Sequence, residues 1–137
     1  MNFDKYINLP YKHSGRDFNG VDCYGLIWLI YKEERNIILP DHLYEYDWVE
    51  KGCNHIIEQT DIVSLNPTFK WIDKDKCNIY DGLFFYASTK RIVVNHIGLY
   101  IGEGHKFVHI SARYNSRVDR LDNLWENRLY GVMRYCG

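Results

Sequence analysis

The chain has 137 residues, a length that suits one domain of ordinary size. Lys and Arg number 17 against 18 Asp and Glu, which leaves a formal charge of -1. This balance argues against the bulk electrostatic attraction on which nucleic-acid and anionic-membrane binders rely. We therefore expect a single domain over residues 1–137, with no nucleic-acid partner and no membrane partner.

Two residue types stand out in the composition. Aromatic residues make up 16% of the chain, with 12 tyrosines, enough to fill a core and still supply a groove or an interface. The cysteines are widely spaced, without a Cys-x-x-Cys pair, so neither a zinc site nor a disulfide framework is expected. They are Cys23, Cys53, Cys77 and Cys136, and we expect the last three to be buried packing residues.

The first half of the chain predicts helices. Residues 1–20 are polar and turn-rich, which indicates a short leading element and a long loop. Asp22 is a candidate N-cap, and apolar residues then recur at three- and four-residue steps, which predicts a helix at about 23–36. A second helix is predicted near 48–60, followed by a loop around Pro67.

The second half predicts an antiparallel sheet. Short aromatic and β-branched runs indicate strands at 83–86, 97–101, 106–110 and 130–135, with a hairpin turn at 102–105. Helices followed by a run of strands place the chain in the α+β class.

Three residues in these elements suggest nucleophilic catalysis. Cys23 begins the predicted helix, where unpaired N–H groups and the helix dipole stabilise a thiolate. In a hairpin turning near Glu103, residues whose numbers sum to about 205 face each other, so His96 and His109 are predicted to be cross-strand neighbours on one face. A bulge between the two histidines would instead turn His109 away. With Cys23 as nucleophile, His96 is the expected base and His109 the group that orients it.

These residues lie in three sequence blocks. They are Tyr11-Lys12-His13-Ser14-Gly15-Arg16-Asp17-Phe18-Asn19-Gly20-Val21-Asp22-Cys23-Tyr24-Gly25-Leu26, Asn95-His96-Ile97-Gly98-Leu99-Tyr100-Ile101-Gly102 and Phe107-Val108-His109-Ile110-Ser111. In residue type and order they resemble the NlpC/P60 family of cysteine peptidases.

The resemblance implies a papain-like α+β fold, with N-terminal helices packed on a small antiparallel sheet. It also implies cleavage of an amide in peptidoglycan stem peptides, commonly between D-γ-glutamyl and a diamino acid. Cys23, His96 and His109 match the catalytic positions, Tyr11 matches a tyrosine beside the oxyanion, and Asp22 matches the acidic residue before the nucleophile. No cofactor and no metal are implied.

A narrower resemblance concerns proteins of phage and prophage tails. Gly-Arg-Asp upstream and Tyr24 after the cysteine are similar to that branch of the family. The first residues lack a basic segment and an apolar segment typical of a signal peptide. We therefore expect synthesis in the bacterial cytoplasm, a place in the virion, and tail or tail-hub proteins as partners beside the stem peptide.

Two alternatives stay open from the sequence. One is a catalytically silent structural or docking tail protein with the same fold, and the other is an acyltransferase or effector hydrolase that acts on a non-wall substrate. Arg16 and Asp17 are expected to form an ion pair that fixes the loop, and His13 is a secondary candidate for lining the cleft.

Overall fold

The structure is a computed structural model that describes residues 3–39, 69–87, 90 and 94–136. In chain order its elements are η1 (Asp4–Tyr6), β1 (Arg16–Asp17), β2 (Gly20–Val21), α1 (Cys23–Arg35), β3 (Phe69–Ile72), β4 (Gly82–Tyr86), β5 (Val94–Gly102), β6 (Lys106–Ser111), β7 (Tyr114–Arg120), α4 (Asn123–Arg128) and β8 (Leu129–Tyr135). The helix predicted near 48–60 and the loop around Pro67 lie outside the described residues.

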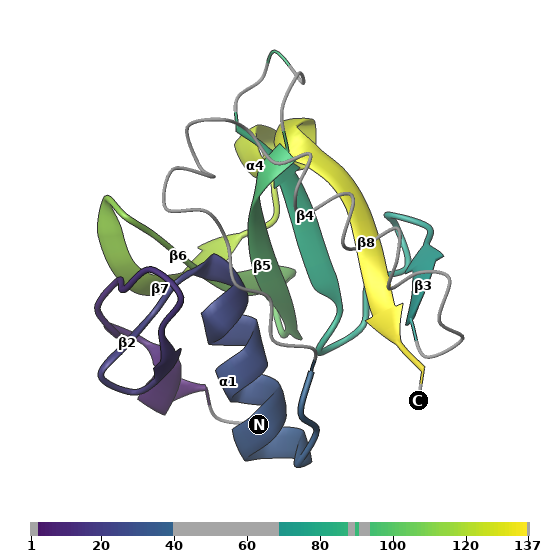
Figure 1. Cartoon of the computed structure of the whole chain (residues 1–137). Coiled ribbons are helices and arrows are strands. Elements are labelled where there is room, and N and C mark those ends of the chain that lie inside the picture. The colour runs from purple at the N-terminus through teal and green to yellow at the C-terminus, as the bar shows by residue number, and fades with distance from the viewer. Residues whose placement is uncertain (1–2, 40–68, 88–89, 91–93, 137) are drawn as a thin grey trace.

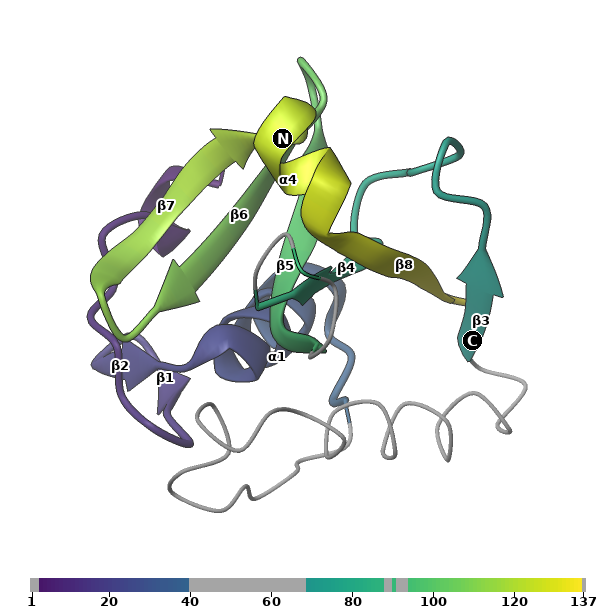
Figure 2. The same ribbon diagram turned by 90° about the horizontal axis from the view of Figure 1, so that it is seen from above.

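A six-stranded antiparallel sheet forms the centre of the fold. Its strand order is β3-β8-β4-β5-β6-β7. All four predicted strands are present, and β3 and β7 are added at the two edges. Figures 1 and 2 show α1 across one face of the sheet, with α4 beside the ends of β5 and β8. The predicted α+β class is confirmed.

Helix α1 forms where its sequence predicts it. The Asp22 side chain accepts a hydrogen bond of 2.7 Å from the backbone N–H of Gly25, which satisfies one of the free donors at the helix start. At the other end Asn36 adopts a left-handed conformation, with φ of 54°, and ends the helix. Most apolar positions between these ends are buried in the core, whereas Tyr24 and Trp28 are partly buried.

Alternating side chains divide the core between the two faces of the sheet. Phe84 belongs to the cluster that packs under α1, whereas its neighbour Phe85 packs on the opposite face with Trp125 of α4. Successive strand residues point to opposite faces, so this difference follows from the strand period of two. Residues of β5 and β6 that share the face of Phe85 are therefore directed away from the body of α1.

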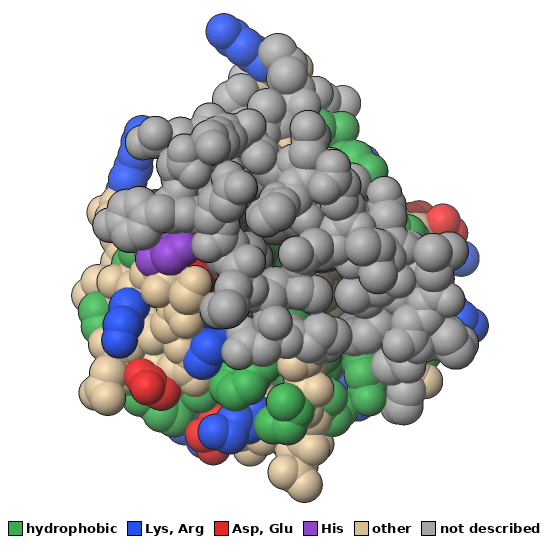
Figure 3. Space-filling model, viewed as in Figure 1, with side chains coloured by type: hydrophobic (Ala, Val, Ile, Leu, Met, Phe, Trp, Pro, Cys, Tyr) green, Lys and Arg blue, Asp and Glu red, His purple; other side chains and the backbone are tan. Residues whose placement is uncertain are grey.

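Charges of both signs lie on the face shown in Figure 3. Acidic and basic side chains of the described residues are interspersed there, and at the lower edge they lie against each other. In the described ranges, no helix combines the length and apolar character needed to cross a bilayer.

Candidate active site

Cys23 is the first residue of α1 and is only 4% exposed. The loop before it is held by Asp22, whose oxygens accept hydrogen bonds from Ser14 N at 2.9 Å and from Arg16 Nη1 at 3.1 Å, besides the helix cap. Three donors on one buried carboxylate fix both the loop and the start of the helix. The Cys23 sulfur is thereby held at the positive end of the helix dipole.

Gly25 explains part of the motif around the cysteine. A Cβ atom at this position would lie 2.0 Å from the carbonyl oxygen of Gly15 and 3.0 Å from an oxygen of Asp22. A side chain would therefore separate the loop from the first turn of the helix. The glycine two residues after the nucleophile is required by this close backbone approach.

Three polar side chains form a chain of hydrogen bonds across β5, β6 and β7. His96 Nε2 lies 2.8 Å from His109 Nδ1, and His109 Nε2 lies 2.6 Å from Asp119 Oδ2. Arg117 Nε donates to the same Asp119 oxygen at 2.9 Å. Each strand contributes one member, so the sheet itself sets the spacing of the chain.

The two histidines share a face, but their expected direct pairing is wrong. Leu99 pairs with Val108 and Tyr100 with Phe107, and continuing this register places Gly98 opposite His109. His96 is two residues farther along β5, hence on the same face and diagonal to His109. The register shifts between Tyr100 and Gly102, so a bulge does lie between the two histidines in the chain. It does not turn His109 away, because the rings of His96 and His109 contact each other on one face.

The hydrogen bonds determine where the protons lie. A carboxylate only accepts, so the Asp119 contact requires a proton on His109 Nε2. In a neutral His109, Nδ1 then accepts, and His96 Nε2 donates to it. His96 Nδ1 is left with a lone pair, which is the state that a base needs.

Burial keeps both rings neutral near pH 7. Desolvation, reinforced by the electrostatic interaction of His96 with His109, lowers the pKa of His96 well below its usual range. Desolvation also lowers the pKa of His109 to about 4, although the Asp119 contact acts in the opposite direction. A neutral His96 is able to take a proton from a thiol.

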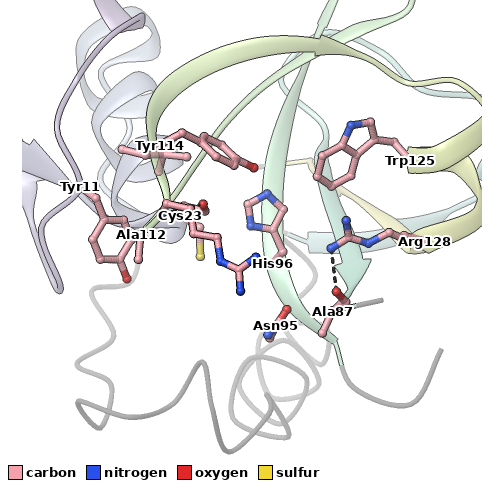
Figure 4. Close-up of a pocket in the computed structure, with 12 residues that line it drawn as sticks. Tyr11, Cys23, Ala87, Asn95, His96, Ala112, Tyr114, Trp125 and Arg128 are labelled. Carbon is pink, nitrogen blue, oxygen red and sulfur yellow. Dashed lines mark hydrogen bonds between the residues drawn. The ribbon is translucent and has the colours of Figure 1, made fainter. Parts of the chain in front are cut away.

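Cys23 and His96 line one cavity of about 310 Å³. Tyr11 also lines it, and Figure 4 shows Cys23 between Tyr11 and His96. The remaining lining residues are Ala87, Asn95, Ile110, Ser111, Ala112, Arg113, Tyr114, Trp125 and Arg128. His109 lies behind His96 and is fully buried. Three of the five candidates, Tyr11, Cys23 and His96, thus meet at one cavity, and His109 supports His96 from behind.

Asp22 caps α1, as the sequence predicts. Its side chain is 0% exposed and does not line this cavity, so it holds the loop and the helix start. The expected ion pair of Arg16 with Asp17 is wrong, because Arg16 pairs with Asp22 at 3.1 Å. Asp17 instead accepts from the backbone N–H of Asn19.

The other cysteines differ from their expected burial. Cys136 is exposed, which contradicts a packing role, and Cys77 is half-buried. Burial raises the pKa of the Cys77 thiol to about 11, so this thiol stays protonated near neutral pH. Cys53 lies outside the described residues.

Asp119 is the functional candidate that the sequence did not reveal. It lies on β7, whose sequence Tyr114-Asn-Ser-Arg-Val-Asp-Arg120 lacks the apolar run of a typical strand. The only feature of this segment that is typical of a strand is the alternation of polar Arg117 and Asp119 around apolar Val118. Without the pairing of β6 with β7, nothing in the sequence links Asp119 to His109.

Across the described ranges, no group of three or more His, Cys, Asp and Glu side chains is placed to hold a metal ion. The donors at this site are engaged with one another, His109 with Asp119 among them.

Comparison with known proteins gives one family. The model of the NlpC/P60 family matches residues 8–134. The gamma-DL-glutamyl hydrolase of Bacillus subtilis (strain 168) is 24% identical over 136 residues, which are 96% of this chain and 27% of that protein.

Solved structures give the same fold. A crystal structure of an NlpC/P60 family protein from Bacillus cereus matches with a TM-score of 0.65 and 25% identity, covering 95% of this chain and 36% of the other. The NlpC/p60 domain of the peptidoglycan hydrolase SagA matches with a TM-score of 0.59 and 19% identity, covering 96% of this chain and 91% of that domain. The chain therefore spans 27% and 36% of the length of the first two relatives, and 91% of the isolated domain.

Proposed function

This chain belongs to the NlpC/P60 family, and on that premise we propose that it is a cysteine peptidase that cleaves an amide bond in peptidoglycan stem peptides through a Cys23 thioester. The observation that carries the proposal is the meeting of Cys23 and His96 at one cavity, with His109 and Asp119 lined up behind His96. A nucleophile, a base and the groups that orient the base are the parts that acyl transfer needs.

In the first half of the reaction, Cys23 Sγ attacks the carbonyl carbon of the scissile amide. Its proton passes to His96 Nδ1, because Nε2 is held by His109. The tetrahedral intermediate then expels the amine, which takes that proton from His96. The products of this half are a free amine and an acyl group joined to Cys23 as a thioester.

In the second half, water enters the place of the amine. His96 Nδ1 removes a proton from the water, and the resulting hydroxide attacks the thioester carbonyl. Collapse of this intermediate breaks the carbon–sulfur bond, and the proton on His96 returns to the sulfur. The acid product leaves, and both residues regain their starting states.

The developing oxyanion needs hydrogen-bond donors. The backbone N–H of Cys23 at the helix start is one candidate, and the hydroxyl of Tyr11, on the wall of the same cavity, is the other. Removal of one such donor from a preorganised site costs about 3 kcal/mol in the barrier. Tyr11→Phe is therefore expected to lower kcat by about 100-fold.

A γ-glutamyl bond is the proposed target. The motif resemblance indicates the D-γ-glutamyl–diamino acid linkage, and the printed name of the Bacillus subtilis relative, gamma-DL-glutamyl hydrolase, supports a γ-linked glutamyl acyl group. We further propose that the protein acts from a phage tail, on the basis of the Gly15-Arg16-Asp17 and Asp22-Cys23-Tyr24 context. Mass spectrometry of purified virions tests this location directly, and consistent absence of the protein from them would contradict it.

The proposed activity is tested on purified peptidoglycan. Fragments released by the protein are identified by mass spectrometry, and Cys23→Ala is compared with Cys136→Ala, a matched change at the exposed cysteine. Loss of release with Cys23→Ala alone is the expected result. Equal release by Cys23→Ala would refute the proposal, and an acyl group trapped on Cys23 from a non-wall donor, without wall cleavage, would assign the chemistry to another substrate.

A further inference from the structure

Two arginines give the cavity at Cys23 a positive wall. Arg113, in the turn between β6 and β7, and Arg128, the last residue of α4, both line this cavity. Among the described residues that line it, none is an aspartate or a glutamate. The described lining of the cavity therefore offers guanidinium groups to a substrate and no carboxylate to balance them.

Arg128 is held in a fixed position. Its Nε donates to the carbonyl oxygen of Tyr86 at 3.0 Å, and its Nη2 donates to that of Ala87 at 3.0 Å. Its guanidinium carbon also lies 4.6 Å from the ring centroid of Trp125. Figure 4 shows the group at the side of the cavity near His96. The anchored side chain keeps Nη1 as a donor outside these contacts.

The charge of Arg128 lacks a carboxylate in the part of the chain that the structure describes. Both anchors are neutral carbonyl groups, and partial burial lowers the pKa of its guanidinium. Its positive charge also contributes to the lowered pKa of His96, which indicates that the field of Arg128 reaches the reaction centre. A partly desolvated cation that has no carboxylate partner among the described residues favours the arrival of an anion.

Arg113 supplies a second charge on the cavity wall. Its backbone N–H donates to Ser111 Oγ at 3.1 Å, which fixes the turn that carries it. Its side chain is exposed and, among the described residues, forms no ion pair with a carboxylate. Asn95, on the same wall, adds an uncharged amide.

We propose that Arg128 and Arg113 bind a free carboxylate next to the scissile amide and thereby select acidic γ-glutamyl substrates over their amidated forms. This inference rests on the proposed function, because it names the chemistry that the same cavity recognises. A glutamyl residue linked through its γ-carbonyl keeps its α-carboxylate, whereas an isoglutamine residue carries a neutral amide in its place. Guanidinium groups bind the first with charge-assisted hydrogen bonds and gain little from the second.

The test compares two stem peptides that differ only at this carboxyl group, one with γ-D-glutamate and one with γ-D-isoglutamine. We expect kcat/KM to be at least about tenfold higher for the acidic peptide, as for loss of one hydrogen bond to a charged group. Equal rates on the two peptides would overturn the inference and leave the proposed function standing. Cleavage of neither peptide would contradict the proposed function, and this inference with it.

Variants then assign the selectivity to residues. Arg113→Gln and Arg128→Gln should each lower the rate on the acidic peptide and bring the ratio of the two rates toward one. Arg120→Gln is the matched control, because Arg120 is an exposed arginine of β7 outside the cavity. Arg113→Gln keeps the test valid if Arg128→Gln misfolds, because the Arg113 side chain makes no hydrogen bond to the backbone of the described residues. An unchanged ratio in a folded Arg113→Gln protein and a folded Arg128→Gln protein would overturn the assignment.

Discussion

Asp119 is the group whose removal tests the proposed proton arrangement most specifically. Its carboxylate holds the proton on His109 Nε2 through a contact of 2.6 Å. In Asp119→Ala, His109 is free to carry its proton on Nδ1 and to donate it to His96 Nε2. His96 would then be protonated on Nδ1, the nitrogen that must accept the proton of the thiol, and the base would be in the wrong tautomer.

The size of the effect follows from the lost contact. A hydrogen bond to a charged group contributes roughly 1.5–3 kcal/mol, and each ~1.4 kcal/mol in the barrier is a factor of ten in rate. We therefore expect Asp119→Ala to lower kcat by about 10- to 100-fold. KM should change little, because Asp119 does not line the cavity.

Asp119→Asn separates the charge from the hydrogen bond. Arg117 and His109 both donate to the same oxygen of Asp119, so both donors favour the amide oxygen at that position. The tautomer of His109 is then kept while the charge is lost, and a smaller decrease in kcat is expected than for Asp119→Ala.

The assay measures kcat, KM and their pH profiles on a γ-glutamyl stem peptide. Asp73→Asn serves as a control, because Asp73 is an exposed surface carboxylate. Wild-type kcat in a folded Asp119→Ala protein would refute the proton arrangement. A rise in KM with kcat unchanged would assign Asp119 to substrate binding instead.

Three further changes affect stability. The pKa of His109 falls from 6.5 to about 4 on folding, so below pH 6.5 the unfolded chain binds more protons than the folded protein. The free energy of unfolding should therefore drop by about 3 kcal/mol between pH 6.5 and 4, and His109→Gln should reduce this drop in urea titrations. Asp22→Ala removes the helix cap and the buried carboxylate that Arg16 contacts. The free energy of unfolding should fall by about 3 kcal/mol in the same titrations, and a fall below about 1 kcal/mol would contradict the assigned contacts. Gly25→Ala forces the Gly15 carbonyl away from the helix and should lower Tm by about 5 °C or more in calorimetry; an unchanged Tm would show that the loop yields freely.

The start of the site could be predicted from the sequence because its signals are local. Asp22, the apolar periodicity after it and the turn at 102–105 each act within a few residues, and the structure has α1 and the β5–β6 hairpin where these signals place them. The shared face of His96 and His109 depends on the bulge beside the turn, where the sum of paired residue numbers changes from 208 at Gly102 and Lys106 to 207 at Tyr100 and Phe107. The expected sum of 205 is also odd, so the sequence predicted the shared face but not the diagonal offset of two residues.

The rest depends on contacts between distant segments. Asp119 joins the site only because polar β7 pairs with β6, and Arg128 reaches the cavity only because α4 follows β7. Neither segment has the apolar pattern that marks an element in a sequence. The partner of Arg16 was likewise set by the folded loop, which brings Asp22 closer to it than the adjacent Asp17.

The proposed reaction passes through a thioester on Cys23, and the intact mass of the protein measures this intermediate directly. The protein is mixed with a γ-glutamyl stem peptide, quenched in acid within the first turnover, and weighed by mass spectrometry, followed by peptide mapping. We expect a mass increase equal to the acyl fragment, located on the peptide that contains Cys23 and absent from Cys23→Ala. Turnover of the peptide with no adduct on Cys23, or with an adduct on another residue, would contradict it.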